Sequence, residues 1–173
     1  MSELSLRPAT AADIPALTSL AAESFVDAFG HLYSPADLAA FLREAKSEAA
    51  TAALIADPDG AMQVATREGA PIAYCKIGYN CGWPDHARGA RAMELKQLYA
   101  AASATGSGVG SALMDWALAA LAAAGADEVQ LSVWSGNHGA QRFYQRYGFE
   151  KIADVTFKVG EQVDDEFLFS KLL

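Results

Sequence analysis

The chain has little of what several common classes of protein require. Its 173 residues contain 13 Lys and Arg against 21 Asp and Glu, for a formal charge of −8. The basic surface that binds nucleic-acid phosphates or anionic lipids is therefore missing. No apolar run approaches the roughly 18 bulky residues of a membrane span, and the N-terminal segment MSELSLRPAT lacks the basic and apolar regions of a secretory signal. We expect no nucleic-acid partner, no membrane partner and no secretion.

Cysteine is also scarce. Cys75 and Cys81 are too few for a disulfide framework or for the ligand set of a structural zinc site. Two reduced thiols are typical of a cytoplasmic protein, so we expect that compartment and no metal. The apolar fraction of 52% is ample for a packed core. The length fits a single domain over residues 1–173.

Hydrophobic periodicity divides the chain into alternating helices and strands. Helices are predicted over 14–29, 35–42, 47–56, 108–124 and 140–147. Strands are predicted over 4–7, 62–67, 72–79, 93–100, 128–134, 152–159 and 167–172, with an irregular loop at 81–90. This order predicts the α+β class, with a mixed, mostly antiparallel sheet and helices on both faces.

A glycine-rich segment, TGSGVGS at 105–111, joins a predicted strand to a predicted helix. Glycine permits positive φ, and the N–H groups at a helix N-terminus favour an anion such as a diphosphate. The segment is therefore a candidate phosphate-binding loop. The alternative is a purely structural loop, which can have the same composition. A Walker A loop is excluded because Ser111 and Ala112, with no lysine, follow Gly110. A Rossmann fingerprint fails because Ser111 or Leu113 occupies its last glycine position. Nucleotide hydrolysis and dinucleotide redox chemistry are therefore disfavoured.

The loop and its flanks resemble the acetyl-CoA site of the Gcn5-related N-acetyltransferase (GNAT) superfamily. In that family a strand ending L-Y-V leads into a loop of pattern Q/R-x-x-G-x-G/A. Here the strand ends Leu98-Tyr99-Ala100 and the loop begins at Thr105, which replaces the family's Gln or Arg and loses its side-chain contact. The family's later pattern N-x-x-A-x-x-F-Y-x-x-x-G-F is matched by Asn137, Ala140, Phe143, Tyr144, Gly148 and Phe149.

This resemblance implies a GNAT-type fold, acetyl-CoA as co-substrate, and roles for individual residues. Tyr144 would protonate the leaving thiolate; the alternative is a packing residue on its helix. The backbone N–H of Ala100 would stabilise the oxyanion. Asn137 would bind the cofactor arm, cap its helix, or do both. The implied cofactor-binding residues are Leu98, Ala100, Gly106, Ser107, Gly108, Val109, Gly110, Ser111, Asn137 and Tyr144.

A narrower likeness is to the bacterial spermidine/spermine N-acetyltransferases. Those proteins have an acidic residue before the L/I-Y pair, as Glu94 is here, and a similar tail. An alkylamine of pKa ~10.4 is almost wholly protonated at neutral pH. Glu94 is therefore the candidate general base, directly or through water; the alternative is a solvated strand carboxylate. The tail residues that carry the likeness are Phe157, Gly160, Asp164 or Asp165, Lys171 and Leu172.

The acceptor side is less specific. His31 and Tyr33, together with Trp83 and Asp85, are candidates for the amine pocket, although loop aromatics often serve packing alone. The charge of −8 favours a cationic acceptor by steering. The leading hypothesis is direct acetyl transfer to a small-molecule amine in a ternary complex, polyamines first. Alternatives are an amino acid, an antibiotic amine, a protein N-terminus, or a non-catalytic acyl-CoA-binding regulatory module. A homodimer is allowed for.

Overall fold

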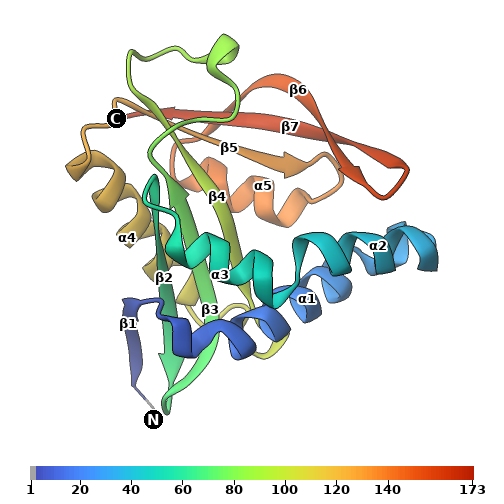
Figure 1. Ribbon diagram of the computed structural model, residues 1–173. Coiled ribbons are helices and arrows are strands. Elements are labelled where there is room, and N and C mark those ends of the chain that lie inside the picture. Colours follow the sequence, from blue (N-terminus) through green and yellow to red (C-terminus); the bar gives the residue numbers. More distant parts are fainter. Residues whose placement is uncertain (1–2) are drawn as a thin grey trace.

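Seven strands form one mixed sheet in the computed structural model, which describes residues 3–173 (Figure 1). Their order is β1-β2-β3-β4-β5-β7-β6, and β4 with β5 is the parallel pair among antiparallel neighbours. The expected α+β class is confirmed. The strands are β1 (Leu4–Pro8), β2 (Gly60–Arg67), β3 (Ala70–Gly78), β4 (Ala92–Ala100), β5 (Glu128–Trp134), β6 (Glu150–Val159) and β7 (Gln162–Leu172).

Helices cover both faces of the sheet, as expected (Figure 1). They are α1 (Ile14–Phe29), α2 (Pro35–Ala45), α3 (Glu48–Ala56), α4 (Val109–Ala123) and α5 (His138–Arg146). α1 and α3 pack on one face, α4 and α5 on the other, and α2 reaches β6. Among the described residues, no helix combines the length and apolar character needed to cross a bilayer.

Strand β3 contributes to both halves of the core because its side chains alternate between the two faces. Tyr74 is buried with Leu17 and Val64 on the α1 side. Its neighbours Cys75 and Ile77 are buried on the α4 side. The two clusters fix the sheet between its helical layers, so the central strands form a rigid base for whatever lies at their ends.

β4 and β5 pair over only part of their length. Ala92–Glu94 lie beside Glu128–Gln130, and beyond that point the two strands separate. β5 continues along β7, whereas β4 continues along β3. The β3–β4 register shifts between Lys76 and Ile77, where Lys96 is the extra residue. Such a bulge bends a strand, which explains why β4 turns away from β5.

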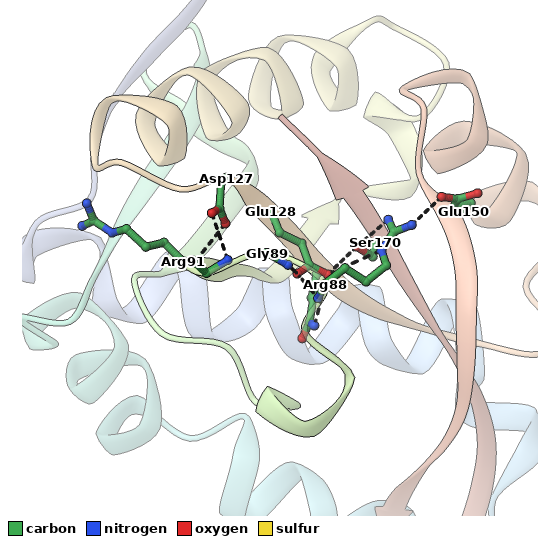
Figure 2. A network of polar contacts seen from close by, with 9 residues as sticks. Arg88, Gly89, Arg91, Asp127, Glu128, Glu150 and Ser170 are labelled. Carbon is green, nitrogen blue, oxygen red and sulfur yellow. Dashed lines mark hydrogen bonds and ion pairs between the residues drawn. The ribbon is translucent and has the colours of Figure 1, made fainter.

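A polar network closes the paired end of these strands (Figure 2). The buried Glu128 carboxylate accepts the backbone N–H groups of Arg88 and Gly89 at 2.6 and 2.8 Å, and the Ser170 hydroxyl. The Arg88 guanidinium donates to Ser170 at 2.9 Å and to Glu150 at 2.6 Å. The loop between β3 and β4 is thereby fastened across β5, β7 and β6. One end of the strand pair is held shut while the other is open.

The main departure from the predicted elements is β7, which begins at Gln162 instead of Phe167. The acidic run at 164–166 has the composition of a turn. Its backbone is nevertheless paired on both sides, since Glu166 lies opposite Val155 of β6 and Trp134 of β5. Ladder pairing outweighs the weak strand propensity of Asp and Glu.

Candidate active site

A cleft of about 500 Å³ opens where β4 and β5 separate. Residues 95–100 of β4 and 131–134 of β5 form its walls. α1 and α5 contribute further lining on the two faces of the sheet, through Phe25 and Phe29 and through Ala140 and Tyr144. The cleft therefore passes between the strands and is accessible to groups from both helical layers.

The backbone of β4 turns two amides toward this cleft. The Ala101 N–H donates to the Ile72 carbonyl at 2.9 Å, which makes these two residues a hydrogen-bonded pair. Because an antiparallel ladder alternates, the N–H groups of Ala100 and Leu98 point away from β3. The Ala100 carbonyl, also directed away, accepts the Ser24 hydroxyl at 3.2 Å. Two of the residues predicted from sequence thus present unpaired amides at the cleft wall.

The glycine-rich loop adopts the predicted backbone. Gly106 and Gly108 have φ of 77° and 84°, and α4 begins at Val109. The amides of residues 109–111 are the first of the helix and have no intrahelical acceptor. Ser107 differs, because its N–H donates to the Ala104 carbonyl at 3.2 Å. Its amide is part of the turn and is not free for an anion.

α5 lies against the start of α4, next to this loop. A Cβ at Gly110 would stand 3.7 Å from the Phe143 ring, so glycine lets the two helices approach. The Asn137 side-chain oxygen accepts the Ala140 N–H at 3.1 Å, which is the predicted cap. Asn137 and Thr105 both line the cleft. The helix cap leaves the amide NH2 of Asn137 available, so capping and ligand binding are compatible.

Tyr144 lines the cleft from α5. Burial raises the pKa of its phenol well above the usual value, and the charges of Cys75, Tyr99 and Glu166 add to the effect. The hydroxyl therefore stays protonated at any ordinary pH. Its ring also contacts Phe143, with ring centroids 5.5 Å apart. Tyr144 is therefore a packing residue whose protonated phenol is also part of the cleft lining.

Glu94 lies away from the cleft lining. Its carboxylate accepts the Gly82 N–H at 3.1 Å. Burial raises its pKa, and the charge of Lys96 and this hydrogen bond oppose the rise. The side chain sits near the closed end of the strand pair, where β4 still runs beside β5. From this position the Glu94 carboxylate does not contact a group in the cleft directly.

Only one of the expected acceptor residues reaches the cleft. Tyr33 lines it, whereas His31, Trp83 and Asp85 do not. His31 lies in the short 3-10 helix that follows α1 and is exposed. Trp83 and Asp85 belong to the loop that Glu128 fastens at the opposite end of the strand pair. The sequence predicts Trp83 and Asp85 at the amine pocket, but the polar network around Glu128 holds their loop at the other end of the strand pair.

Five further residues line the cleft together with Tyr33, and the sequence assigns them no site role beyond the tail match at Phe157 and Asp164. They are the aromatic residues Phe29, Trp134 and Phe157 and the carboxylates Asp164 and Glu166. The Tyr33 hydroxyl donates to Asp164. The two carboxylates are alternate residues of β7, a signal that emerges only when the strand is started at Gln162.

The architecture is that of the acetyltransferases of the GCN5-related class. A PaiA N-acetyltransferase from Thermoplasma acidophilum, solved in complex with coenzyme A, superposes with a TM-score of 0.79 over 99% of each chain at 20% identity. A GCN5-related N-acetyltransferase from Rhodopseudomonas palustris gives 0.80 over 100% of this chain and 98% of its own, also at 20% identity.

Sequence comparison leads to the same family. Residues 17–149 match the acetyltransferase (GNAT) family. An uncharacterised N-acetyltransferase of Mycobacterium tuberculosis is 31% identical over 93% of this chain and 98% of its own length. The chain belongs to the GNAT family. It is an N-acetyltransferase, with acetyl-CoA as its acetyl donor.

Proposed function

We propose that the protein transfers the acetyl group directly to a primary amine of a small molecule held in the same cleft, with polyamines as the first choice. One observation carries this proposal. The cleft has the free amides of β4 and of the glycine-rich loop beside it, and carboxylates with aromatic rings at its acceptor side. Aromatic faces and carboxylates are the groups that bind an organic cation.

The residues present fit the donor. The amides of Gly106, Gly108 and residues 109–111 belong to the N-terminus of α4 and the loop before it, where the helix dipole favours a diphosphate. Leu98 supplies an N–H to the arm that leads into the cleft, and the side-chain amide of Asn137 supplies a second donor. Ser107 is left out of this set because its N–H is already bonded.

Three further groups carry the chemistry. The Ala100 N–H stabilises the negative charge that develops on the thioester oxygen during attack. The Tyr144 hydroxyl, kept protonated by burial, donates its proton to the departing sulfur. Glu94 remains the general base predicted from sequence, and from its position beside Gly82 it would act through water.

The charge of the acceptor, the compartment, the oligomeric state and the alternative acceptors are also part of the proposal. The charge of −8 steers a cationic acceptor toward the protein. We expect the reaction to take place in the cytoplasm, and a homodimer is a further expectation. Amino acids, antibiotic amines and protein N-termini are the alternative acceptors. A regulatory module that binds acyl-CoA without turnover is the alternative class of function.

An amine panel tests the proposal. Purified protein is incubated with acetyl-CoA and polyamines, amino acids, aminoglycosides or N-terminal peptides, and release of free thiol is followed. We expect the highest kcat/KM with polyamines. Preference for another group would change the acceptor but keep the enzyme. Acetyl-CoA binding by calorimetry without thiol release for any amine would establish the regulatory module instead.

A further inference from the structure

Glu166 is a cleft-lining carboxylate that the mechanism above leaves without a role. It lies on β7 directly opposite Trp134 of β5, at the wide end of the strand separation. Ser132 of β5 also lines the cleft, and its side chain lowers the pKa of Glu166. Glu94, in contrast, is outside the lining and bonded to the β3–β4 loop. Of the two glutamates, Glu166 is the one that a molecule in the cleft would touch.

The two carboxylates of the cleft, Asp164 and Glu166, differ in the groups that surround them. Among residues 3–173, none of the ion pairs involves Asp164 or Glu166. Asp164 is satisfied by neutral donors, since it accepts the Tyr33 hydroxyl and the Gln162 side-chain amide. For Glu166, Ser132 is the one neighbour that lowers the pKa of the carboxyl group. A positively charged acceptor would therefore supply the counter-ion that Glu166 lacks.

Glu166 also lies near the groups expected to react. Its charge raises the pKa values of Tyr33, Tyr99 and Tyr144, which come from three different elements around the cleft. The other titratable groups that line the cleft are Asp164 on β7 and Lys96 on β4. Glu166 is therefore a lining residue whose charge acts on three tyrosines that also line the cleft.

We propose that Glu166 binds the acceptor's ammonium group and accepts the proton that must leave before the amine can attack. This inference rests on the proposed transfer of acetyl to an amine, and within it Glu166 of β7 replaces Glu94 of β4 as the general base. Ser132, which also lines the cleft, acts through Glu166 by lowering the pKa of its carboxyl group.

The proton balance is complete without any further reagent. One N–H bond of the ammonium breaks and its proton passes to Glu166. The neutral nitrogen forms a C–N bond with the thioester carbon, and the C–S bond breaks. The sulfur takes the Tyr144 proton, and the phenolate recovers a proton from the nitrogen. Glu166 then releases its proton to solvent, so ammonium and thioester give amide, thiol and one proton.

The surroundings of Glu166 are consistent with this task. Burial raises its pKa, the Ser132 hydrogen bond lowers it, and the charge of Asp164 raises it again, with a net upward shift. A carboxylate with a raised pKa is a stronger base than an ordinary glutamate. The effect of Asp164 depends on Tyr33, which holds that carboxylate in place.

The test measures kcat/KM for the best amine of the panel against pH. The variants are Glu166→Gln, Glu94→Gln and, as a matched control in an exposed turn, Glu161→Gln. We expect Glu166→Gln to lower kcat/KM about 10²- to 10³-fold at neutral pH. The deficit should shrink by about tenfold per pH unit toward pH 10, as the amine loses its proton unaided. Acetyl-CoA affinity should be unchanged, and Glu161→Gln should behave as wild type.

A second variant, Ser132→Ala, keeps the inference testable if Glu166→Gln fails to fold. Ser132→Ala removes a hydrogen bond that lowers the Glu166 pKa, so the acidic limb of the kcat/KM profile should move to higher pH. A merely structural role for Ser132 would leave that limb where it is.

Three results would overturn the inference while leaving the proposed function standing. They are a Glu166→Gln profile parallel to wild type, a pH-dependent deficit in Glu94→Gln instead, or a rise in acceptor KM with kcat and pH dependence unchanged. Absence of turnover by the wild-type protein on every amine would remove the proposed function itself, and this inference with it.

Discussion

The hydroxyl of Tyr33 donates to the carboxylate of Asp164, a residue 131 positions further along the chain. The Tyr33 ring also stacks on Phe25 of α1, with centroids 5.9 Å apart. The acceptor side of the cleft is therefore formed where the N-terminal helices contact the C-terminal hairpin of β6 and β7. Its shape depends on contacts that no local segment contains.

Removing the Tyr33 hydroxyl should weaken the contact between these two regions. Tyr33→Phe loses a hydrogen bond to a carboxylate, which contributes roughly 1.5–3 kcal/mol, and we expect a lower free energy of unfolding with a several-fold higher acceptor KM. Acetyl-CoA affinity should stay constant. A double-mutant cycle with Asp164→Asn, read by chemical denaturation, should give a coupling above about 0.5 kcal/mol. Strict additivity would show that the contact does not exist in solution.

Tyr144→Phe separates proton donation from packing. The ring and its contacts with Phe143 and Phe149 remain, and only the hydroxyl is lost. We expect kcat to fall about 10²-fold with little change in acetyl-CoA affinity or thermal stability. Tyr147→Phe is the matched control on the same helix. Its hydroxyl donates to Asp115 and the Ser111 carbonyl outside the cleft, so turnover should be retained. Equal kcat in both variants would assign Tyr144 to packing.

Gly108→Ala tests the amide cradle. Gly108 has φ of 84°, and an added Cβ would meet no atom within 4 Å, so the cost is backbone strain of about 1 kcal/mol. Gly69, in the β2–β3 turn, has φ of 79° and equally open surroundings. Both alanine variants should lose similar stability, whereas only Gly108→Ala should weaken acetyl-CoA binding in calorimetry. An equal loss of affinity in Gly69→Ala would mean that the effect is global.

Lys46 makes stability depend on pH. It is 7% exposed, and its Nζ lies 4.6 Å from the centroid of the Tyr99 ring. Burial lowers its pKa to about 8 from 10.5. Between these values the unfolded chain binds a proton that the folded chain has released, so the free energy of unfolding rises with pH. The full effect is about 3 kcal/mol.

Replacing Lys46 should remove both the loss of stability caused by burying its ammonium group and the pH dependence of the free energy of unfolding. Lys46→Met should unfold at higher denaturant concentration near pH 7 and show no rise between pH 8 and 10.5. Lys76→Met is the contrast, because Lys76 is equally buried but pairs with Asp57 at 3.1 Å and donates to the Leu54 carbonyl at 2.8 Å. That variant should be less stable than wild type. Destabilisation of both variants would contradict the assignment of Lys46.

Glu128 should matter for stability far more than its neighbour Glu150. Glu128 has no exposed surface, and Gln in its place would set an NH2 group against the amides of Arg88 and Gly89. We expect a loss of about 3 kcal/mol. Glu150→Gln, at the exposed side of Arg88, should cost under about 1 kcal/mol. Denaturant midpoints decide between these values.

The same carboxylate should contribute to acid unfolding. Burial alone would raise the pKa of Glu128, but the hydrogen bonds from Ser170, Gly89 and Arg88 bring it below the usual value. Its stabilisation is complete above about pH 4.5 and is lost as the pH falls through the lower, folded-state pKa. Wild type should therefore lose stability in this acid range more steeply than Glu128→Gln.

Much of the fold and of the donor site could be predicted from local patterns. Caps such as Ser34 and Asn137 hydrogen-bond as their sequence positions indicate. Gly106 and Gly108 have the positive φ that a strand-to-helix loop of this composition requires. Local patterns suffice there because one short segment supplies both the conformation and the groups that use it.

The acceptor side was decided by tertiary structure. Glu166 faces the cleft because the ladders with β5 and β6 extend β7 over an acidic run that resembles a turn. Trp83 is kept away because Arg88 and Gly89 are fastened to Glu128, 39 or more residues later in the chain. The sequence by itself determined the glycine-rich loop and the helix start that we propose to hold the acetyl donor, since their turn and cap hydrogen bonds are local. The acceptor pocket depends on side chains from distant elements, and their meeting is set by strand register and by the divergence of β4 from β5, which no local pattern encodes.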